Sequence, residues 1–393
     1  MKYYSADYIL PIVSEPIANG VIVLDDHGLI QDIKTRDELP SADVEHFTGV
    51  IMPGMVNTHC HLELSHMKGI CPTGTKLIPF IQTVVQQREF EEEIILEHIE
   101  KQDRYMWETG IQAVGDISNK EDTAVQKSRS PISYYTFVEM FDMMQPFMTE
   151  ETIEKSRAVF TAQAGDNGNK KSFVPHAPYS VTPALFDFIN KANPDSRTIS
   201  IHNSETLDEL QMFQDGSGGF KGFFKGFGLT LDHFDPIGKG SIYYVLAHMD
   251  PKKRNLFVHN TLTTADDITA AVEWSKNTYW ASCPNANLYI ENKLPYYRTF
   301  MDAGAKMTLG TDSIMSNWQL SIWEEIKTIK RMQSYVPLTE LLQWATINGA
   351  EALGYHKTMG SLEVGKSPGI VHVDVHWQGE DTDISQSVSK RVV

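Results

Sequence analysis

Short apolar runs that end on a histidine or an aspartate recur along this chain. Five of them finish on residues able to bind a metal or move a proton, at 50–59, 173–176, 199–202, 256–259 and 307–312. Helix-like stretches separate these runs, and alternating strands and helices predict a parallel sheet. The number of units, with polar groups at the carboxyl ends of the strands, indicates an α/β fold, a (β/α)8 TIM barrel. All five ends would then lie on one rim.

The two ends of the chain carry a different pattern. Turn signals at Asn19-Gly20 and at 26–28 flank short apolar runs, which is typical of a hairpin. The segment 360–375 returns to turns and short strands, and we expect it to pair with the N-terminal strands. A small β-sandwich domain is therefore predicted from residues 1–52 and 355–393, beside a barrel domain at 53–354.

His59 and His61 lie where the first of these buried strands is expected to end. Because side chains alternate across a strand, residues two apart point the same way, so the two imidazoles converge on one point. That geometry suits a metal ion. Cys60 between them would face the other way, as a packed thiol. Two strand histidines can also be ordinary hydrogen-bonded groups, so the metal hypothesis requires further ligands.

Charge and hydropathy exclude several classes of protein. The formal net charge is −17, with 51 acidic and 34 basic side chains. Such a surface repels phosphate backbones and anionic lipids, so neither a nucleic acid nor a membrane is expected as a partner. No long apolar run and no apolar signal segment is present, and we expect a cytoplasmic protein. The oligomeric state stays open, with a homodimer among the alternatives.

Longer helical patterns are expected at 76–107, 320–332 and 338–353. Thr182-Pro183 has the form of an N-cap followed by proline at the first helical position. The acidic run 89–93 is interpreted as a solvated helical face. For Trp280 and Trp323, we expect packing in the core.

Five motifs occur in a family-specific order along the chain. They are PGMVNTHCHL at 53–62, HAPYS at 176–180, HNSE at 202–205, VHN at 258–260 and GTDS at 310–313. In this order the chain resembles the amidohydrolase superfamily of metal-dependent hydrolases, and within it the deaminase and chlorohydrolase branch. That branch includes cytosine, guanine, aminodeoxyfutalosine and adenosine-type deaminases and triazine hydrolases. The segments 345–354 and 360–366 resemble the branch too, so the likeness spans nearly the whole chain.

The resemblance implies one divalent metal ion per chain. Its ligands would be His59, His61, His202 and Asp312, each at a strand end. Bound Zn²⁺ lowers the pKa of its water from about 15.7 to about 7, which makes hydroxide available at neutral pH. Zinc is the first expectation, and Fe²⁺ accepts the same nitrogen and oxygen ligands.

The resemblance also implies catalytic roles for three residues. Glu205 would protonate the heterocycle and later help to move a proton to the departing amine. His259 would orient the attacking water, and Asp312 would accept its proton as well as binding the metal. For Glu205 alone, the alternative is a charge at the start of the helix that begins near residue 207.

Binuclear amidohydrolases carry a lysine at the end of the fourth strand, where this chain has Pro175-His176. A mononuclear site is therefore expected, and His176 becomes a candidate substrate contact. Glu63 and Trp318 are further candidates for substrate binding, with core packing as the alternative for Trp318. In the segment 283–287, Ala286 replaces the hydroxyl residue common in the branch, which leaves one substrate contact in doubt.

The region after the histidine pair points to a substrate. The segments HLELS at 61–65, IPFI at 78–81 and QRE at 87–89 resemble aminodeoxyfutalosine deaminases, which act on an adenine nucleoside. The expected function is hydrolytic deamination of an amino-substituted N-heterocycle, with an adenine-type nucleoside such as aminodeoxyfutalosine first. Metal-bound hydroxide would attack the ring carbon and release ammonia. The alternatives are hydrolysis of a cyclic amide or chloro-heterocycle, or a non-catalytic metal-binding protein.

Overall fold

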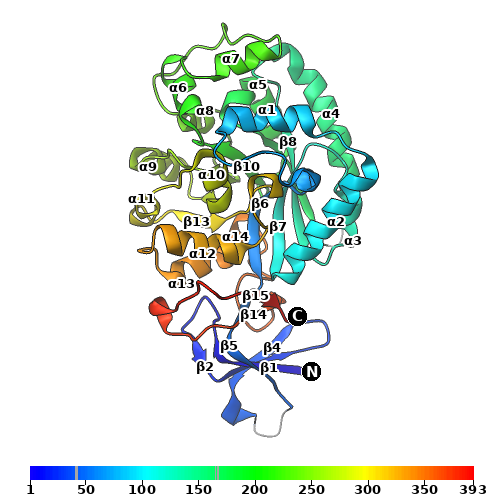
Figure 1. Cartoon of the computed structure of the whole chain (residues 1–393), viewed down its shortest axis with the longest axis vertical. Coiled ribbons are helices and arrows are strands. Elements are labelled where there is room, and N and C mark those ends of the chain that lie inside the picture. Colours follow the sequence, from blue (N-terminus) through cyan, green and yellow to red (C-terminus); the bar gives the residue numbers. More distant parts are fainter. Residues whose placement is uncertain (40–42, 164, 166–167) are drawn as a thin grey trace.

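The structure is a computed structural model that describes residues 1–39, 43–163, 165 and 168–393. A large barrel lies above a small sheet module in the view of Figure 1. The strands are β1 Lys2–Ile9, β2 Ile17–Ala18, β3 Gly20–Leu24, β4 Ile30–Thr35, β5 Glu45–Pro53, β6 Met55–Cys60, β7 Ile111–Ser118, β8 Ser133–Met140, β9 Lys170–Pro175, β10 Thr198–Asn203, β11 Arg254–His259, β12 Thr278–Ser282, β13 Lys306–Leu309, β14 Ile370–Val373 and β15 Ser389–Arg391.

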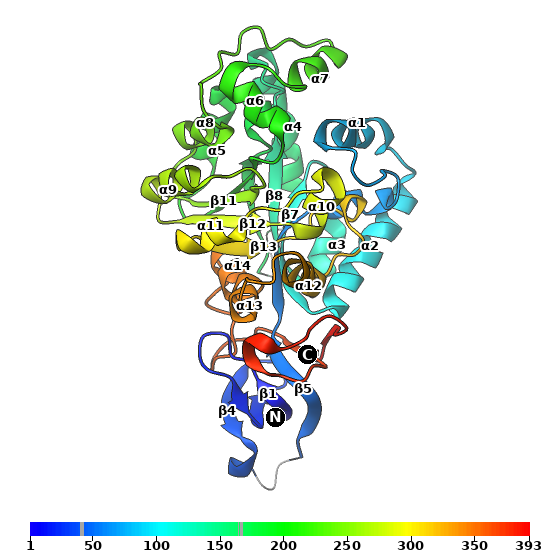
Figure 2. The same cartoon turned by 60° about the vertical axis from the view of Figure 1, so that its left-hand side comes forward.

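Helices follow and surround the strands of the barrel in Figures 1 and 2. They are α1 Leu77–Gln87, α2 Glu92–Glu108, α3 Ala124–Arg129, α4 Thr149–Ala162, α5 Pro183–Ala192, α6 Leu207–Asp215, α7 Phe220–Gly226, α8 Ser241–His248, α9 Ala265–Trp274, α10 Pro284–Glu291, α11 Tyr297–Asp302, α12 Ile322–Met332, α13 Leu338–Trp344 and α14 Ile347–Ala352.

The barrel consists of two parallel four-stranded arcs. One runs β6-β7-β8-β9 and the other β10-β11-β12-β13. A parallel bridge between Cys60 and Asp312 joins β6 to the end of β13, and the His202 backbone N–H donates to the His176 carbonyl at 3.0 Å across the other seam. The predicted α/β barrel is confirmed, and its closure brings the strand ends onto one rim.

The two chain ends form the small module. β14 pairs antiparallel with β5, which pairs parallel with β1, so N- and C-terminal strands share one sheet. The predicted hairpin is present as β3 and β4. The module has its own apolar cluster, which includes Tyr4, Ile22 and Ile370. A β domain built from both ends is thus confirmed, while the boundaries at 52–53 and 354–355 stay a prediction.

Two predicted helices are each divided in the structure. The 76–107 pattern forms α1 and α2, and Arg88 caps α1 and turns its guanidinium back to Glu63 at 3.1 Å. The acidic run therefore spans the connection and the first turn of α2, where negative charge favours a helix N-terminus. The 338–353 pattern breaks at Thr346, whose φ of −132° is not helical.

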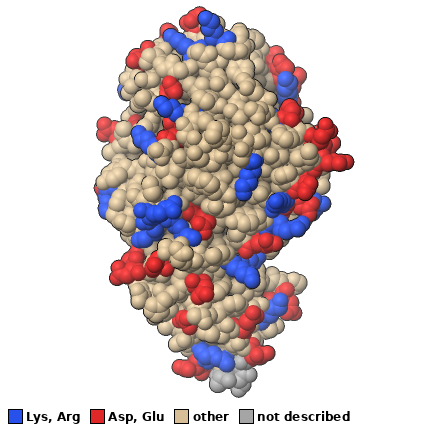
Figure 3. Space-filling model, viewed as in Figure 1, with Lys and Arg blue, Asp and Glu red and all other residues tan. Residues whose placement is uncertain are grey.

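Other local predictions are confirmed. The Thr182 side chain accepts a hydrogen bond from the Leu185 N–H and caps α5, with Pro183 at its first position. Trp280 and Trp323 are buried in the core. No helix in the described part of the chain has both the length and the apolar character needed to cross a membrane. Acidic and basic side chains are interspersed on the face shown in Figure 3.

Candidate active site

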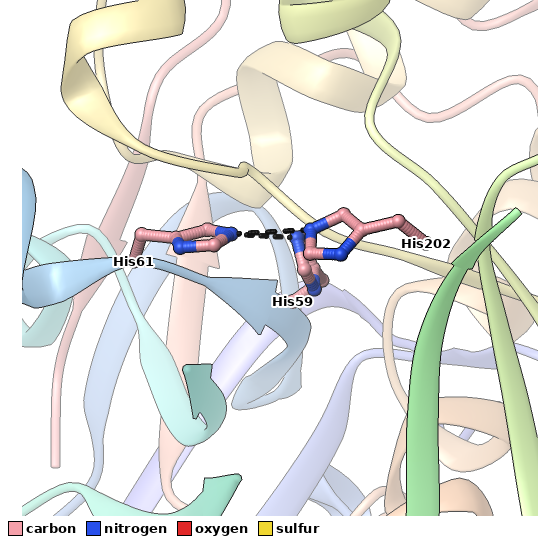
Figure 4. Close-up of side chains that lie close together, drawn as sticks. All are labelled: His59, His61 and His202. Atoms are coloured by element: carbon pink, nitrogen blue, oxygen red, sulfur yellow. Dashed lines mark hydrogen bonds between the residues drawn. The ribbon is translucent and has the colours of Figure 1, made fainter. Parts of the chain in front are cut away.

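Three histidines from two strands converge at the rim of the barrel. His59 lies in β6, His61 follows that strand directly, and His202 lies in β10. The His61 Nε2 atom is 3.2 Å from His59 Nε2 and 3.4 Å from His202 Nε2 (Figure 4). Cys60 is buried and lies outside this group of donor atoms. The alternation of the strand thus places both imidazoles on one side.

Asp312 brings a carboxylate to the same point. Its Oδ1 lies 3.7 Å from His59 Nε2 and 3.4 Å from His61 Nε2, while Ser316 Oγ donates to its Oδ2 at 2.8 Å. The Asp312 backbone has a φ of +56°, in the left-handed region that asparagine and aspartate tolerate best. Gly310 permits this approach, because a Cβ there would lie 2.8 Å from the Cβ of His59.

The donor atoms fit one divalent metal ion. His202 Nδ1 donates to the His176 carbonyl at 2.7 Å, so its Nε2 carries a lone pair that faces His61. Burial lowers the pKa of His61 to about 3 and that of His202 well below its usual value. Three neutral imidazoles and one carboxylate are suitable ligands for zinc, and a cation between them would remove the repulsion of facing lone pairs.

Glu205 lies beside this centre, two residues after β10. Its Oε1 is 3.7 Å from His259 Nε2. Burial raises the pKa of its carboxyl well above the usual value, which favours the protonated form at neutral pH. The Glu209 carboxylate accepts the backbone N–H groups of Ser204 and Glu205, both at 2.9 Å, and so fixes the turn that carries Glu205. The buried carboxyl group is therefore positioned to donate a proton in the cavity.

His259 ends β11 and is held in one orientation. Its Nδ1 donates to Asn287 Oδ1 at 2.8 Å, which directs Nε2 toward Glu205. The φ of His259 is +73°, an unusual value for a histidine that the surrounding fold must enforce. Sequence reasoning assigned no role to Asn287, although the 283–287 segment already resembled the deaminase branch.

His176 and Glu63, two predicted substrate contacts, line the cavity, but they differ in how many of their polar atoms are already hydrogen-bonded. His176 follows β9 and shares a hydrogen bond with Ser180 through Nδ1 at 2.7 Å. Glu63 is only 2% exposed, and both of its oxygens are occupied. One accepts from Arg88, and the other accepts the backbone N–H groups of Asn119 and Lys120 at 2.8 and 3.1 Å. The Glu63 carboxylate thus binds its own chain.

Trp318 is not brought into the cavity. It is 48% exposed and lines a separate surface pocket against α2 and Lys68. Its ring packs against Tyr289 with centroids 5.5 Å apart. Its closeness to Asp312 in sequence was misleading, because Asp312 lines the cavity and Trp318, six residues later, does not.

Glu139 is a cavity residue that sequence reasoning missed. It lies near the end of β8, is buried, and places Oε1 3.5 Å from His202 Nδ1. Asn119 Nδ2 donates to its Oε2 at 2.9 Å, while Oε1 has no hydrogen-bond partner. Burial raises the pKa of Glu139 to about 8. The sequence did contain a signal for it, because Glu139 is the next-to-last residue of the apolar strand pattern at 133–140.

These side chains surround a cavity of about 110 Å³. His61, His202, Glu205, His259 and Asp312 form its floor. The opposite wall is apolar and comes from α1, through Leu77, Phe80, Ile81 and Val84. A flat ring of mixed polarity would meet polar groups on one side and aliphatic groups on the other.

The chain belongs to the amidohydrolase family, whose model matches residues 50–393. It is a hydrolase that acts on carbon–nitrogen bonds. Two relatives are deaminases. An adenosine deaminase of Helicobacter pylori is 26% identical over 88% of this chain and 86% of the relative. A 5-methylthioadenosine/S-adenosylhomocysteine deaminase of Bacillus cereus is 24% identical over 95% and 86%.

Solved structures share the fold. Helicobacter pylori aminofutalosine deaminase in complex with methylthio-coformycin superposes with a TM-score of 0.79 at 21% identity, over 94% of this chain and 91% of that one. Atrazine chlorohydrolase from Arthrobacter aurescens, complexed with zinc, gives 0.76 at 15% identity, over 98% and 91%. These structures show the shared fold, and the family model and the two deaminase relatives agree with the deaminase and chlorohydrolase branch.

Proposed function

We propose that this protein is a metal-dependent deaminase that hydrolyses the amino group from an N-heterocycle. The first substrate to consider is an adenine-type nucleoside such as aminodeoxyfutalosine. The observation that carries the proposal is the meeting of Glu205 and His259 beside four metal-type donors in one buried cavity. A metal-binding protein without activity has no need of a buried carboxyl group next to its donors.

His59, His61, His202 and Asp312 would hold one divalent ion, zinc first and iron as the alternative. Such an ion lowers the pKa of its water to about 7 and so supplies hydroxide at neutral pH. Asp312 accepts the proton of the attacking water, and His259 Nε2 accepts a hydrogen bond from that water and so orients it. Burial lowers the pKa of His259, which favours the neutral ring with its proton on Nδ1, where Asn287 accepts it, and a lone pair on Nε2.

Glu205 handles the proton on the substrate side. Its protonated carboxyl donates to the ring nitrogen next to the reacting carbon, which makes that carbon a better electrophile. A C–O bond then forms, and the C–N bond to the amino group breaks. The proton taken from the water passes to the departing amine, which leaves as ammonia, and Glu205 regains its own proton as the ring returns to the neutral product.

The names of the relatives support a purine nucleoside. Adenosine and 5-methylthioadenosine deaminases match most of the chain, and methylthio-coformycin is bound in a structure with the same fold. His176 is a proposed substrate contact at the wall of the cavity. We propose that Glu63 contributes through Arg88, and we leave Trp318 out of the substrate contacts because it lines a different pocket.

Ammonia release tests the proposal. Purified protein with one equivalent of zinc is incubated with adenine nucleosides, free purines, pterins, cytosines and chlorotriazines. We expect ammonia from an adenine nucleoside, at a rate above that of the other members. Chloride release, or ring opening of a cyclic amide, without ammonia from any member would contradict deamination and favour the other hydrolytic reactions.

A further inference from the structure

The turn that carries Glu205 is a strained piece of backbone. It follows β10 directly, and Ser204 has a φ of +49°. Left-handed backbone is uncommon for a serine and persists only where the surrounding structure holds it. Ser204 and Glu205 are both buried, so their backbone N–H and C=O groups need partners away from bulk water. The position of the Glu205 carboxyl group therefore depends on the residues that bind this turn.

Glu209 binds the N–H groups of the turn. It is buried in α6, where its Oε1 accepts the Ser204 N–H and its Oε2 accepts the Glu205 N–H, both at 2.9 Å. Ser241, the first residue of α8, donates its hydroxyl group to the same Oε1, and α6 and α8 lie side by side (Figures 1 and 2). Both oxygens of Glu209 thus act as acceptors. An amide side chain, with one oxygen and one NH₂ group, cannot reproduce this pattern.

Thr261 binds the other side of the turn. Its Oγ1 donates to the Glu205 carbonyl at 2.6 Å. Thr261 lies two residues after His259, and both His259 and Asn260 have positive φ values, +73° and +60°. The turn after β11, which carries His259, is therefore hydrogen-bonded to the turn after β10, which carries Glu205. Each of these two strained turns helps to hold the other.

Building on the deaminase function above, we propose that Glu209, Ser241 and Thr261 form a clamp that holds the carboxyl group of Glu205 in position for proton transfer to the substrate. Glu209 and Thr261 are positioning residues, and Ser241 completes the clamp by binding Glu209. None of the three lines the active-site cavity. A change in one of them reaches the reaction through the placement of Glu205, and small displacements of a catalytic group lower the rate strongly.

A double-mutant cycle with Glu205→Gln tests the clamp in the zinc-loaded protein. Glu209→Gln should lower kcat for an adenine nucleoside roughly 10–100-fold, with KM and metal content unchanged. In the Glu205→Gln background the same change should have almost no further effect, because the proton donor that Glu209 positions is already absent. Glu273→Gln, at an exposed position of α9, is the control and should change kcat in neither background. Equal fold losses from Glu209→Gln in the two backgrounds, or native kcat in Glu209→Gln, would overturn the proposal.

Two substitutions at Thr261 test the clamp from the other side, and they decide the matter if Glu209→Gln does not fold. Thr261→Val removes the hydroxyl group and keeps a similar shape, whereas Thr261→Ser retains the donor. We expect kcat to fall roughly ten-fold in Thr261→Val and to stay near the native value in Thr261→Ser. Equal values of kcat in the two variants would show that the hydrogen bond to the Glu205 carbonyl does not position the carboxyl group.

Failure of the clamp and failure of the deaminase function give different results. If the native protein releases ammonia and the double-mutant cycle is additive, the clamp is wrong and the deaminase remains. If no nucleoside releases ammonia, the deaminase proposal fails, and amide hydrogen exchange in residues 203–206 decides about the clamp. Glu209→Gln should then speed exchange in this segment roughly ten-fold, with the native rate in Glu273→Gln. An unchanged rate in Glu209→Gln would overturn the clamp.

Discussion

The two ends of the cavity are built in different ways. At the metal end, each polar side chain sits on a strand end and is oriented by another group: His202 by a carbonyl, His259 by Asn287, and Asp312 by Ser316. At the outer end, beyond α1, Phe223 and Phe224 of α7 are buried against other aromatic rings, whereas Phe227 after α7 and Phe141 after β8 are 42% and 39% exposed. The comparison teaches that the barrel holds the metal-type donors in fixed orientations, and we propose that the helices above it determine the choice of substrate.

The largest effect should come from Glu205→Gln. The amide keeps the shape but cannot donate the carboxyl proton, so kcat for deamination should fall roughly 10²–10⁴-fold. Metal content, measured by elemental analysis, should stay unchanged because Glu205 is not a ligand. Glu97→Gln on exposed α2 is the matched control and should retain native kcat. Native turnover in Glu205→Gln would contradict the proposed proton donation by the Glu205 carboxyl.

A glycine-to-alanine change at each end sharpens the comparison. In Gly310→Ala the new Cβ would collide with His59, whereas in Gly222→Ala on α7 no atom lies within 4 Å. We expect metal affinity to fall roughly 10–100-fold in Gly310→Ala, as for other changes that displace ligands. Competition with a chelator measures it. Gly222→Ala should bind metal as the native protein does, and equal affinities in the two variants would show that the metal end is not rigid.

Asn287→Ala should have a smaller effect. Loss of the acceptor for His259 Nδ1 frees the ring to change tautomer and rotate, so kcat should fall roughly ten-fold, within the range for residues that orient a catalytic or ligating histidine. Asn287→Asp keeps an acceptor at the same place and should recover most of the activity. Steady-state kinetics at saturating substrate separates the fall in kcat from a change in KM. Equal losses of kcat in Asn287→Ala and Asn287→Asp would point to a purely structural role for Asn287.

The smallest effect on activity is expected from Glu325, which lies beneath the metal end and accepts from Asn285 and Asn317. Burial raises its pKa to about 8, above its value in the unfolded chain, so the folded state binds more protons. Stability contributed by this group is therefore present at low pH and is lost as the pH rises from about 4.5 to about 8.

Glu325→Gln should reduce this loss of stability with rising pH, because the amide does not titrate. The free energy of unfolding between pH 5 and pH 8, from denaturant melts, should decline less in the variant than in the native protein, by up to about 4 kcal/mol. Glu97→Gln is again the control and should keep the native slope. Identical slopes in Glu325→Gln and native protein would show that Glu325 is ionised in the fold.

The metal end was largely predictable from sequence, and the outer end was not. Strand alternation alone places His59 and His61 together, and barrel closure brings His202, His259 and Asp312 to the same rim. The partners of these residues, Asn287 in α10 and Ser316 in a short 3-10 helix, reach the site through tertiary packing that no local pattern specifies. Trp318 and Glu63 show the same limit, because the sequence does not reveal that the first is half exposed or that the carboxylate of the second is bound by Arg88 and by the backbone at 119–120.

The central claim is a single metal site that drives deamination, and a zinc titration of the metal-free protein tests it most directly. Ammonia release from an adenine nucleoside is followed as zinc is added in fractions of an equivalent. Activity should rise linearly and reach its plateau at one equivalent per chain. A plateau at two equivalents, or ammonia release that does not depend on metal, would contradict the account.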